Sequence, residues 1–571
     1  MKDSDPAALV GGLIALADAA ETRGEAEQAL MFWAQAGAVG GPVKPSSSES
    51  RPYRLKAALT KRRFAVPSDW AGAATRPLSE LISLVDDWVR LLDFQNLRRL
   101  EVSLETTGGC EAEFALTYLR MALCYQTQCV REARMFAMRL LEPRFADLRL
   151  EDCPRPGPVF KAQAIIFRTE TLLFGHATFP VEAAVQRPVA YDDLMMRTLW
   201  SRSPAQALER AQRLAIFPKP PLAAEVLACV LQARLGHTEA AWSTFNAIAL
   251  RRRVRGRGMH PELAMVGVLL SPTVETRLDW FRAYYGEFGL EAPTLGCHGF
   301  FDELDLALPS IDSKGPLVTI CVTAFNAAKT VEAALNSLLL QTYRPLEIIV
   351  VDDRSSDETV RILRRMAATD DRIRVLTSDR NGGTYVAKNR ALSVARGHYF
   401  TCHDADDWAH PRRIERHVAL MEKYPQLVAS RSDWVRMTDE GVPVLRGTLG
   451  VFSHANPAST FFRRETVMEG IGYYDQVRVD ADLEHWLRLR AAFGVDRMAR
   501  LRLPLALGRL HAASLTQFGQ AAQNEEHFSA VRSEYRAAAL AWRQRMMEAG
   551  DLRMPFPQSE RPFPAPEGFE A

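Results

Sequence analysis

The chain has 571 residues, more than one hydrophobic core usually serves, so two or three domains are expected. Its 71 lysines and arginines nearly balance 69 aspartates and glutamates, and the net charge of +2 provides no field that would attract nucleic acid. The eight cysteines are scattered and form no C-x-x-C pair, which predicts buried thiols in a reducing compartment. The sequence has no membrane-length apolar run and no signal-peptide pattern, so a cytoplasmic protein is expected, and peripheral membrane contact stays open.

Residues 1–308 are expected to form a mainly α-helical domain, because Ala, Leu, Arg and Glu dominate and runs of β-branched residues are scarce. Helical hairpins are expected at 13–33, 114–141 and 222–245. They loosely resemble tetratricopeptide-type repeats, but no strict period is present and a non-repeat helical domain fits about equally well. Two roles stay open: recruitment of an acceptor or protein partner, self-association included, or packing that only covers the second domain.

A linker at 309–316, PSIDSKGP, separates the helical region from a segment in which strands and helices alternate. With helices between them, strands are expected at 317–323, 346–351, 373–376 and 399–402. This order predicts an α/β domain over 317–518 with a largely parallel sheet, whose ligands bind at the C-terminal strand ends. Residues 519–571 are expected to form one amphipathic helix ending near residue 549, followed by a proline-rich, disordered tail.

The turns after the first two strands carry side chains suited to a nucleoside. The first strand ends at Thr323, followed by Phe325 and Asn326, and the second ends at Asp352 and Asp353. A strand-end carboxylate can accept a hydrogen bond from a base N–H, while an adjacent aromatic ring can stack on the base. Neither turn contains the glycine pattern of a Rossmann dinucleotide site or of a P-loop, so these two classes are not expected.

The next two motifs suit a diphosphate and a metal ion. The turn NGGT, which contains Gly383, precedes a helix bearing Lys388, and a helix N-terminus with a lysine favours phosphate. After the fourth strand, Asp404 and Asp406 flank Ala405. The two carboxylates point the same way on an extended backbone and provide the hard oxygen ligands that suit Mg²⁺ or Mn²⁺. A D-x-D triplet alone is weak, but here it follows two other nucleotide-binding motifs on one predicted sheet.

Together these motifs resemble the inverting family-two glycosyltransferases with the GT-A fold. The resemblance covers 317–518 and rests on VTICVTAFN, EIIVVDDRSSD, AKNRAL, GHYFTCHDADDWAHPRRI, NPASTFFRRE and IGYYDQVRVDADLEHWLRL. It implies an α/β GT-A domain, a nucleotide-diphospho-sugar transferase with a mostly parallel sheet. It does not extend into the helical region.

The resemblance implies donor contacts at the strand ends. Thr323 and Asp353 would hold the nucleobase, with Asp353 on a ring N–H and Asp352 in support. Lys388 would face the diphosphate at a position where the family often has arginine. Lysine keeps the positive charge but cannot make the two parallel hydrogen bonds of a guanidinium group. The residues beside these in the same turns would complete the nucleotide-sugar site.

The resemblance also implies a metal site and the edge of the sugar site. Asp404 and Asp406 would bind the ribose and the metal, Asp406 more directly. His511 falls where many relatives place a histidine that faces phosphate or metal. Asp407 and Trp408 would border the sugar and the acceptor.

For the catalytic base, the family uses a Glu-Asp pair that here reads Ala481-Asp482. Asp482 matches the aspartate and is the expected base, and Asp480 is the second choice. Arg488, on the same expected helix, would pair with these acids.

The function implied is metal-dependent, inverting transfer of a sugar from a nucleoside-diphosphate sugar, most plausibly a UDP-sugar, to a hydroxyl of a glycan or protein, as in polysaccharide biosynthesis. Mn²⁺ or Mg²⁺ is the implied cofactor. The alternative is a catalytically inactive interaction or scaffold protein that keeps the transferase fold. A nucleotidyltransferase is disfavoured, because the turn FNAAK after the first strand is not a glycine-rich basic loop.

Overall fold

The computed structural model describes residues 76–570 except 146–147, 149, 151–152, 154–156, 175–187, 218–219, 255–258, 295–299, 312–313, 447–449 and 512–528. The helical hairpin expected at 13–33 therefore lies outside the described residues, as does part of the 309–316 linker.

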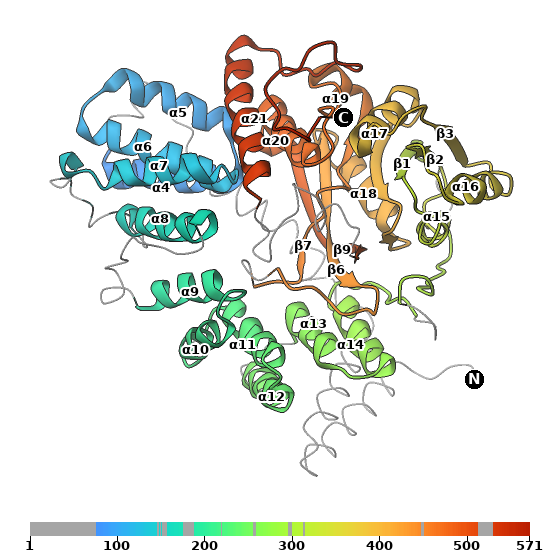
Figure 1. Cartoon of the computed structure of the whole chain (residues 1–571), viewed down its shortest axis with the longest axis horizontal. Coiled ribbons are helices and arrows are strands. Elements are labelled where there is room, and N and C mark those ends of the chain that lie inside the picture. The colour runs from blue at the N-terminus through green and yellow to red at the C-terminus, as the bar shows by residue number, and fades with distance from the viewer. Residues whose placement is uncertain are drawn as a thin grey trace.

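The first half of the described chain is an array of α-helices (Figure 1). The helices are α4 (Leu78–Leu91), α5 (Phe94–Thr107), α6 (Cys110–Gln126), α7 (Val130–Leu140), α8 (Pro158–Phe174), α9 (Pro188–Leu199), α10 (Pro204–Ala215), α11 (Leu222–Arg234), α12 (Thr238–Val254), α13 (Pro261–Leu270) and α14 (Val274–Gly286). Both expected hairpins in the described range are confirmed, as α6–α7 and α11–α12. The array curves around one side of the second domain, from α4–α7 at the blue end to α13–α14 in green.

The second half is an α/β domain, as the alternation predicts. Its strands are β1 (Val318–Ala324), β2 (Leu346–Asp352), β3 (Ile373–Thr377), β4 (Tyr399–Asp404), β5 (Trp408–Ala409), β6 (Ala429–Thr438), β7 (Ser453–Ala455), β8 (Phe461–Arg463) and β9 (Met498–Leu510). Its helices are α15 (Val331–Leu339), α16 (Thr359–Ala367), α17 (Gly383–Val394), α18 (Arg413–Lys423), α19 (Arg464–Gly470), α20 (Ala481–Phe493) and α21 (Ala530–Ala549).

The nine strands form one sheet in the order β3-β2-β1-β4-β8-β6-β9-β5, with β7 beside β6. Strands β3, β2, β1 and β4 are parallel, so their carboxyl ends share one edge. At the other side, β5 pairs antiparallel with β9 through Trp408 and Leu507. This pairing brings the turn after β4 next to the end of β9, more than a hundred residues later in the chain.

The helical array and the α/β domain share their hydrophobic cores. One buried cluster joins α4–α8 to α17, α20 and α21, and a second joins α9–α14 to the other face of the sheet. Polar contacts cross both boundaries. Gln95 of α5 donates to the carbonyl of Ala491 in α20 at 3.3 Å, and buried Glu262 of α13 accepts the amides of Phe452 and Ser453 at 2.5 and 3.1 Å. The helical half is therefore packed into the molecule rather than joined to it by a linker alone.

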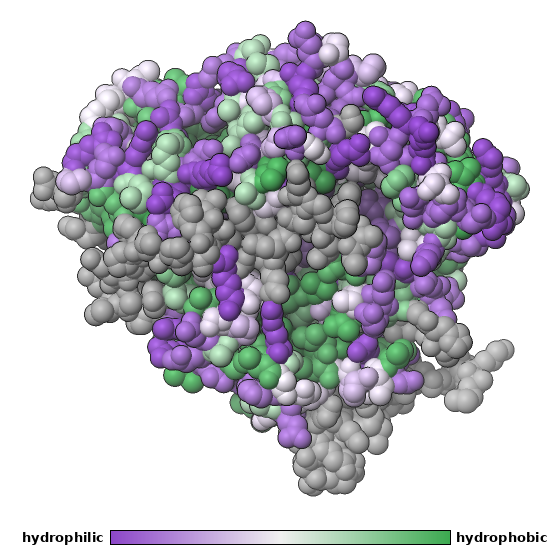
Figure 2. All heavy atoms as spheres, in the orientation of Figure 1, coloured by the Kyte–Doolittle hydropathy of each residue, from purple (hydrophilic) through white to green (hydrophobic). Residues whose placement is uncertain are grey.

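Figure 2 shows how hydrophobic surface is distributed on one face. Polar residues dominate its outline, while hydrophobic residues gather in the middle of the lower half, where α13 and the sheet meet in Figure 1. None of the helices in the described ranges is long and apolar enough to cross a membrane.

The expectation of a disordered tail is wrong. Helix α21 is followed by residues 550–570, which pack against the α/β domain through four buried side chains: Leu552, Met554, Phe563 and Phe569. Met554 also exchanges backbone hydrogen bonds with Ile471 and Tyr473. The prolines suggested disorder, but the apolar residues between them supply the burial that orders the segment.

Candidate active site

The turn after β2 and the glycine-rich turn before α17 are joined by Asp353. Its Oδ1 accepts the amide of Gly382 at 3.0 Å and its Oδ2 accepts that of Gly383 at 2.7 Å. Gly383 has φ +79°, a left-handed conformation that favours glycine. A carboxylate offers about four acceptor positions, so Asp353 retains lone pairs while it holds this turn.

The other strand-end residues surround this junction. Thr323 Oγ1 lies 2.9 Å from Thr384 Oγ1, which ties the end of β1 to α17. Asp352 is buried; its Oδ2 accepts the Ser355 amide at 3.1 Å, whereas its Oδ1 has no hydrogen-bond partner among the described residues. Phe325 is 52% exposed, so its ring is free to meet a ligand.

Asn326 stabilises the same edge of the sheet. It has φ +49°, and its Oδ1 accepts the Ser356 amide at 2.8 Å. Its own amide donates to Ser355 Oγ at 2.9 Å. The residue therefore holds the turns after β1 and β2 together, and both turns lie at the C-terminal edge predicted from the sequence.

Lys388 of α17 points into the interior rather than into solvent. It is 3% exposed, its Nζ lies 4.0 Å from Asp404 Oδ1, and it sits over the ring of Tyr385. Burial alone would lower its pKa, but the Cys402 thiol and the carboxylates of Asp404 and Asp482 outweigh burial and raise the pKa. The lysine is therefore a fixed positive charge between the D-x-D turn and the start of α20.

The D-x-D turn meets the end of β9 as the β5–β9 pairing requires. His511 Nε2 lies 3.1 Å from Asp406 Oδ2, so the expected pair of metal-side residues is brought together. This hydrogen bond raises the pKa of His511 above its usual value. Burial raises the pKa of Asp404; the charge of Lys388 opposes this effect and the charge of Asp406 adds to it. Ala405 between the two acids is buried.

Asp407 and Trp408 lie behind this turn. Asp407 is buried and accepts the Arg509 amide at 3.0 Å, while Trp408 is buried in β5 and packs edge-on against His410. Burial raises the pKa of Asp407 well above its usual value. Both residues hold the D-x-D turn against β9, and their expected place at the border of the sugar and the acceptor stays a prediction.

No three His, Cys, Asp or Glu side chains in the described part of the chain are grouped closely enough to hold a metal ion by themselves. Asp406 and His511 nevertheless offer an oxygen and a nitrogen at one point, with the half-buried Asp404 on the same turn. Mg²⁺ and Mn²⁺ are commonly held by one or two carboxylates plus phosphate oxygens and water. The residues present fit such a shared ion.

Asp482 lies in the first turn of α20, near Lys388 and Tyr385. Burial raises the pKa of Tyr385 well above its usual value, and the charge of Asp482 raises it further. Its Oδ1 accepts the amide of Leu483 at 2.8 Å. On the sheet side, Arg431 of β6 donates to the Asp482 backbone carbonyl at 3.1 Å and stacks on Trp486. After burial and Asp406, the charge of Asp482 also contributes to the raised pKa of Asp404, so the two carboxylates lie close enough to interact.

Asp480 has a different environment. It is 5% exposed, and its carboxylate is paired with Arg532 at 3.1 Å and with Arg536 at 2.5 and 2.8 Å. Burial alone would raise its pKa, but Arg536 and then Arg532 lower it below its usual value. A carboxylate held in this way is a poor proton acceptor.

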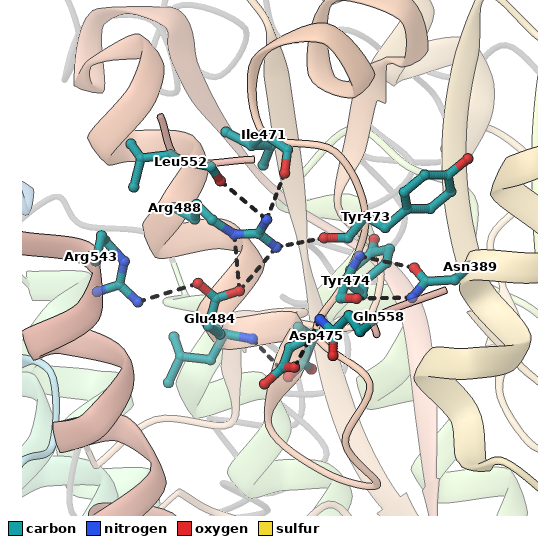
Figure 3. Close-up of polar contacts among 12 residues, drawn as sticks. Asn389, Ile471, Tyr473, Tyr474, Asp475, Glu484, Arg488, Arg543, Leu552 and Gln558 are labelled. Carbon is teal, nitrogen blue, oxygen red and sulfur yellow. Dashed lines mark hydrogen bonds and ion pairs between the residues drawn. The ribbon is translucent and has the colours of Figure 1, made fainter. Parts of the chain in front are cut away.

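The expectation that Arg488 pairs with Asp480 or Asp482 is wrong. Arg488 is fully buried and pairs with Glu484 at 3.1 Å, one helical turn before it, and also donates to the carbonyls of Ile471 and Tyr473 (Figure 3). Sequence reasoning missed the true partners of Asp480. Arg532 and Arg536 lie about fifty residues later, and their one-turn spacing in an amphipathic helix gave no sign of which carboxylate they meet.

Comparison with known proteins finds similarity over part of the chain. The model of the family described as Glycosyl transferase family 2 matches residues 319–482. The chain is similar to the putative glycosyltransferase EpsE of Bacillus subtilis, with 36% identity over 113 residues that cover 20% of this chain and 41% of that protein. It is also similar to the putative teichuronic acid biosynthesis glycosyltransferase TuaG of Bacillus subtilis, with 32% identity over 146 residues, 26% of this chain and 56% of that protein.

A solved structure of S. aureus TarS 1-349 in complex with UDP-GlcNAc is similar at 18% identity and a TM-score of 0.29, over 34% of this chain and 59% of that one. The chain spans less than two thirds of the length of EpsE and of TuaG. All of these matches fall on part of the chain only.

Proposed function

We propose that this chain, whose residues 319–482 form a family-two glycosyltransferase domain of the GT-A fold, transfers a sugar from a nucleoside-diphosphate sugar to an acceptor hydroxyl. One observation carries the proposal. Four sets of side chains lie near the C-terminal edge of the parallel strands: Asp352 and Asp353, the buried Lys388, the Asp406–His511 pair, and Asp482 at the start of α20.

The donor base is proposed to bind at the β1–β2 edge. The remaining lone pairs of Asp353 are the proposed acceptors for a ring N–H, with the buried Asp352 in support, and the exposed ring of Phe325 can stack on the base. Uracil presents such an N–H at its edge, so a UDP-sugar is the proposed donor. Asp353 also holds the glycine-rich turn and Asp352 also holds the Ser355 amide, so replacing either residue changes the shape of the site as well.

The diphosphate is proposed to lie between α17 and the D-x-D turn, where Lys388 provides a fixed positive charge. Asp406 and His511, with Asp404, would hold a Mn²⁺ or Mg²⁺ ion that neutralises charge on the diphosphate. Asp407 keeps the turn in place through the Arg509 amide.

In the proposed reaction Asp482 takes the proton from the acceptor hydroxyl as its oxygen bonds to the anomeric carbon. The bond from that carbon to the diphosphate oxygen breaks, and the electron pair leaves with the nucleoside diphosphate. Lys388 stabilises the charge that develops on this leaving group. A single displacement inverts the anomeric configuration. The acceptor is proposed to be a glycan, with a protein hydroxyl as the second choice, because the similar proteins include one named for teichuronic acid biosynthesis.

The test uses the full chain with a panel of uridine, guanosine and cytidine sugar nucleotides, with Mn²⁺ or Mg²⁺. We expect release of nucleoside diphosphate from one UDP-sugar, and calorimetric binding of UDP that EDTA weakens. Asp406→Asn should weaken the metal-dependent part of UDP binding and remove most activity, because an amide is a poorer ligand for a hard cation. Asp371→Asn, at an exposed carboxylate outside the site, is the matched control.

Absence of both UDP binding and donor turnover, in a chain that is folded, would contradict the proposal and favour the scaffold alternative. Tight UDP binding that EDTA does not affect would keep the donor assignment and remove the metal assignment from Asp406 and His511.

A further inference from the structure

The loop and helix that carry Asp482 are held by the last part of the chain. We define the C-terminal segment as residues 529–570, which comprise α21 and the packed tail. Three acids near Asp482 are bound to it: Asp475 and Asp480 before it, and Glu484 after it. Figure 3 shows Asp475 beside Gln558, and Glu484 between Arg488 and Arg543.

Asp480 is the contact nearest to the proposed base. It is the residue before α20, and it has φ +73°, which is rare for a residue with a side chain. Arg532 and Arg536, on consecutive turns of α21, both bind its carboxylate. The three side chains are each less than one-tenth exposed, so this is an interior cluster rather than a surface ion pair. The strained start of α20 is thereby fixed two residues before Asp482.

Asp475 and Glu484, which lie before and after Asp480 in the chain, are also bound by side chains of the C-terminal segment. Fully buried Asp475 accepts hydrogen bonds from Tyr535 Oη and Arg561 at 2.9 Å each, and from Gln558 at 3.3 Å. Glu484 lies 3.7 Å from Arg543 of α21. The tail also reaches the donor side of this loop, because the amide of Arg478 donates to the Phe569 carbonyl at 2.8 Å.

Asp482 is the exception within this set. In the described part of the chain no arginine, lysine or histidine lies within ion-pair distance of its carboxylate, although Arg431 binds its backbone carbonyl. Its backbone is therefore fixed from two directions, while its carboxylate has the Tyr385 hydroxyl and the Leu483 amide beside it and, among the described residues, no cationic partner. A general base needs this combination, since a fixed position sets the reaction geometry and a neutralising partner would reduce basicity.

We infer that the C-terminal segment positions the proposed base, and that Arg532 and Arg536 are positioning residues for Asp482 that act through Asp480. The catalytic role in this inference rests on the proposed function, whereas the structural role rests on the contacts alone. It also gives the helical array a link to the site. Ser533 of α21 accepts the amide of Val130 and donates to the Gln128 carbonyl at 3.0 Å each, and Arg536 binds the Gln128 side chain.

The experiment compares Arg536→Gln, Arg532→Gln and the conservative Arg536→Lys with the matched control Arg545→Gln, an exposed residue of the same helix. For the proposed UDP-sugar reaction we expect the two Gln variants to lower kcat about 10–100-fold with KM for the donor and UDP affinity nearly unchanged, the size expected when a reacting group is displaced by roughly 1 Å. Arg536→Lys should recover part of kcat, and Arg545→Gln should match the wild type. Equal kcat in the wild type and both Gln variants would overturn the inference.

A second measurement does not depend on turnover. Hydrogen exchange of the full-length protein should become faster in peptides spanning 474–486 in the two Gln variants, and should stay unchanged in the 381–388 turn. If a Gln variant fails to fold, Asp480→Asn replaces it, because the amide keeps the size of the side chain and loses the charge. Unchanged exchange at 474–486 would overturn the inference. A wild type that turns over no sugar nucleotide would instead contradict the proposed function, and the exchange result would then decide the positioning role alone.

Discussion

The two sides of the proposed site are built in different ways. The donor side is held by contacts between neighbouring strand ends and the start of α17: the Asp353 carboxylate accepts two amides of the glycine-rich turn, and the Thr323 hydroxyl contacts that of Thr384. The base side is held by side chains from distant segments, because Asp480 depends on Arg532 and Arg536 of α21. The comparison teaches that donor binding and proton transfer can be disturbed separately, and the predictions below use this separation.

The largest catalytic effect is expected for Asp482→Asn. An amide cannot accept the acceptor proton, and loss of a general base typically lowers rates by about 10²–10⁴-fold. UDP affinity by calorimetry should stay close to that of the wild type, because Asp482 does not belong to the donor side. An active Asp482→Asn variant alongside an inactive Asp480→Asn variant would show that the base is misassigned.

The next effect concerns the helical array. A chain beginning at Ser310 would expose the faces of both shared hydrophobic clusters, so we expect it to be insoluble or to unfold without cooperativity. Calorimetric melting and size-exclusion chromatography measure this. A soluble, cooperatively folded fragment that binds UDP would show that the array is dispensable for the fold and would favour acceptor recruitment as its main role.

On the donor side, Gly383→Ala tests the left-handed turn. A residue with a Cβ at φ +79° costs about 1–2 kcal/mol, and the added Cβ would lie 3.4 Å from the Arg478 side chain. We expect a several-fold rise in KM for the donor with a small change in kcat. A loss confined to kcat would show that the turn acts on the base side as well.

A smaller effect is expected from pH. Arg536 and Arg532 lower the pKa of Asp480, so its ion pairs stabilise the fold above the unfolded-state pKa, near 3.8, and this stabilisation is lost as pH falls below that value. Urea unfolding should therefore show the wild type to be more stable than Arg536→Gln at pH 6–7, with the gap closing toward pH 3. A gap that is constant with pH would mean that Arg536 acts by packing alone.

The sequence predicted which elements meet at the proposed donor side, because the motifs that indicate these elements are local. The strand ends, the glycine-rich turn and the D-x-D triplet each lie within a few residues, and the parallel alternation of strands and helices places them on one edge. The approach of His511 to Asp406 was predicted only through the resemblance. Its physical cause is the β5–β9 pairing, which the sequence does not reveal because β5 has two residues.

The base side could not be predicted in the same way. Arg488 was expected to meet Asp480 or Asp482, but it satisfies Glu484 and two backbone carbonyls instead. The tail was expected to be disordered from its prolines, yet Phe563 and Phe569 are buried against Tyr535. The Glu484–Arg488 pair has the ordinary i,i+4 spacing of a helix and could have been read from the sequence. The contacts of the tail join residues far apart in the chain, and composition or periodicity carries no information on such pairings.

The central claim, that the two sides are held independently, is tested most directly by hydrogen exchange of the full-length protein with and without UDP and Mn²⁺, in the wild type and in Arg536→Gln. We predict that the ligands protect peptides covering 323–327, 352–357 and 381–388 in both proteins, and that Arg536→Gln speeds exchange only at 474–486. Protection by UDP that disappears in Arg536→Gln, or exchange at 474–486 that does not respond to the substitution, would contradict the account.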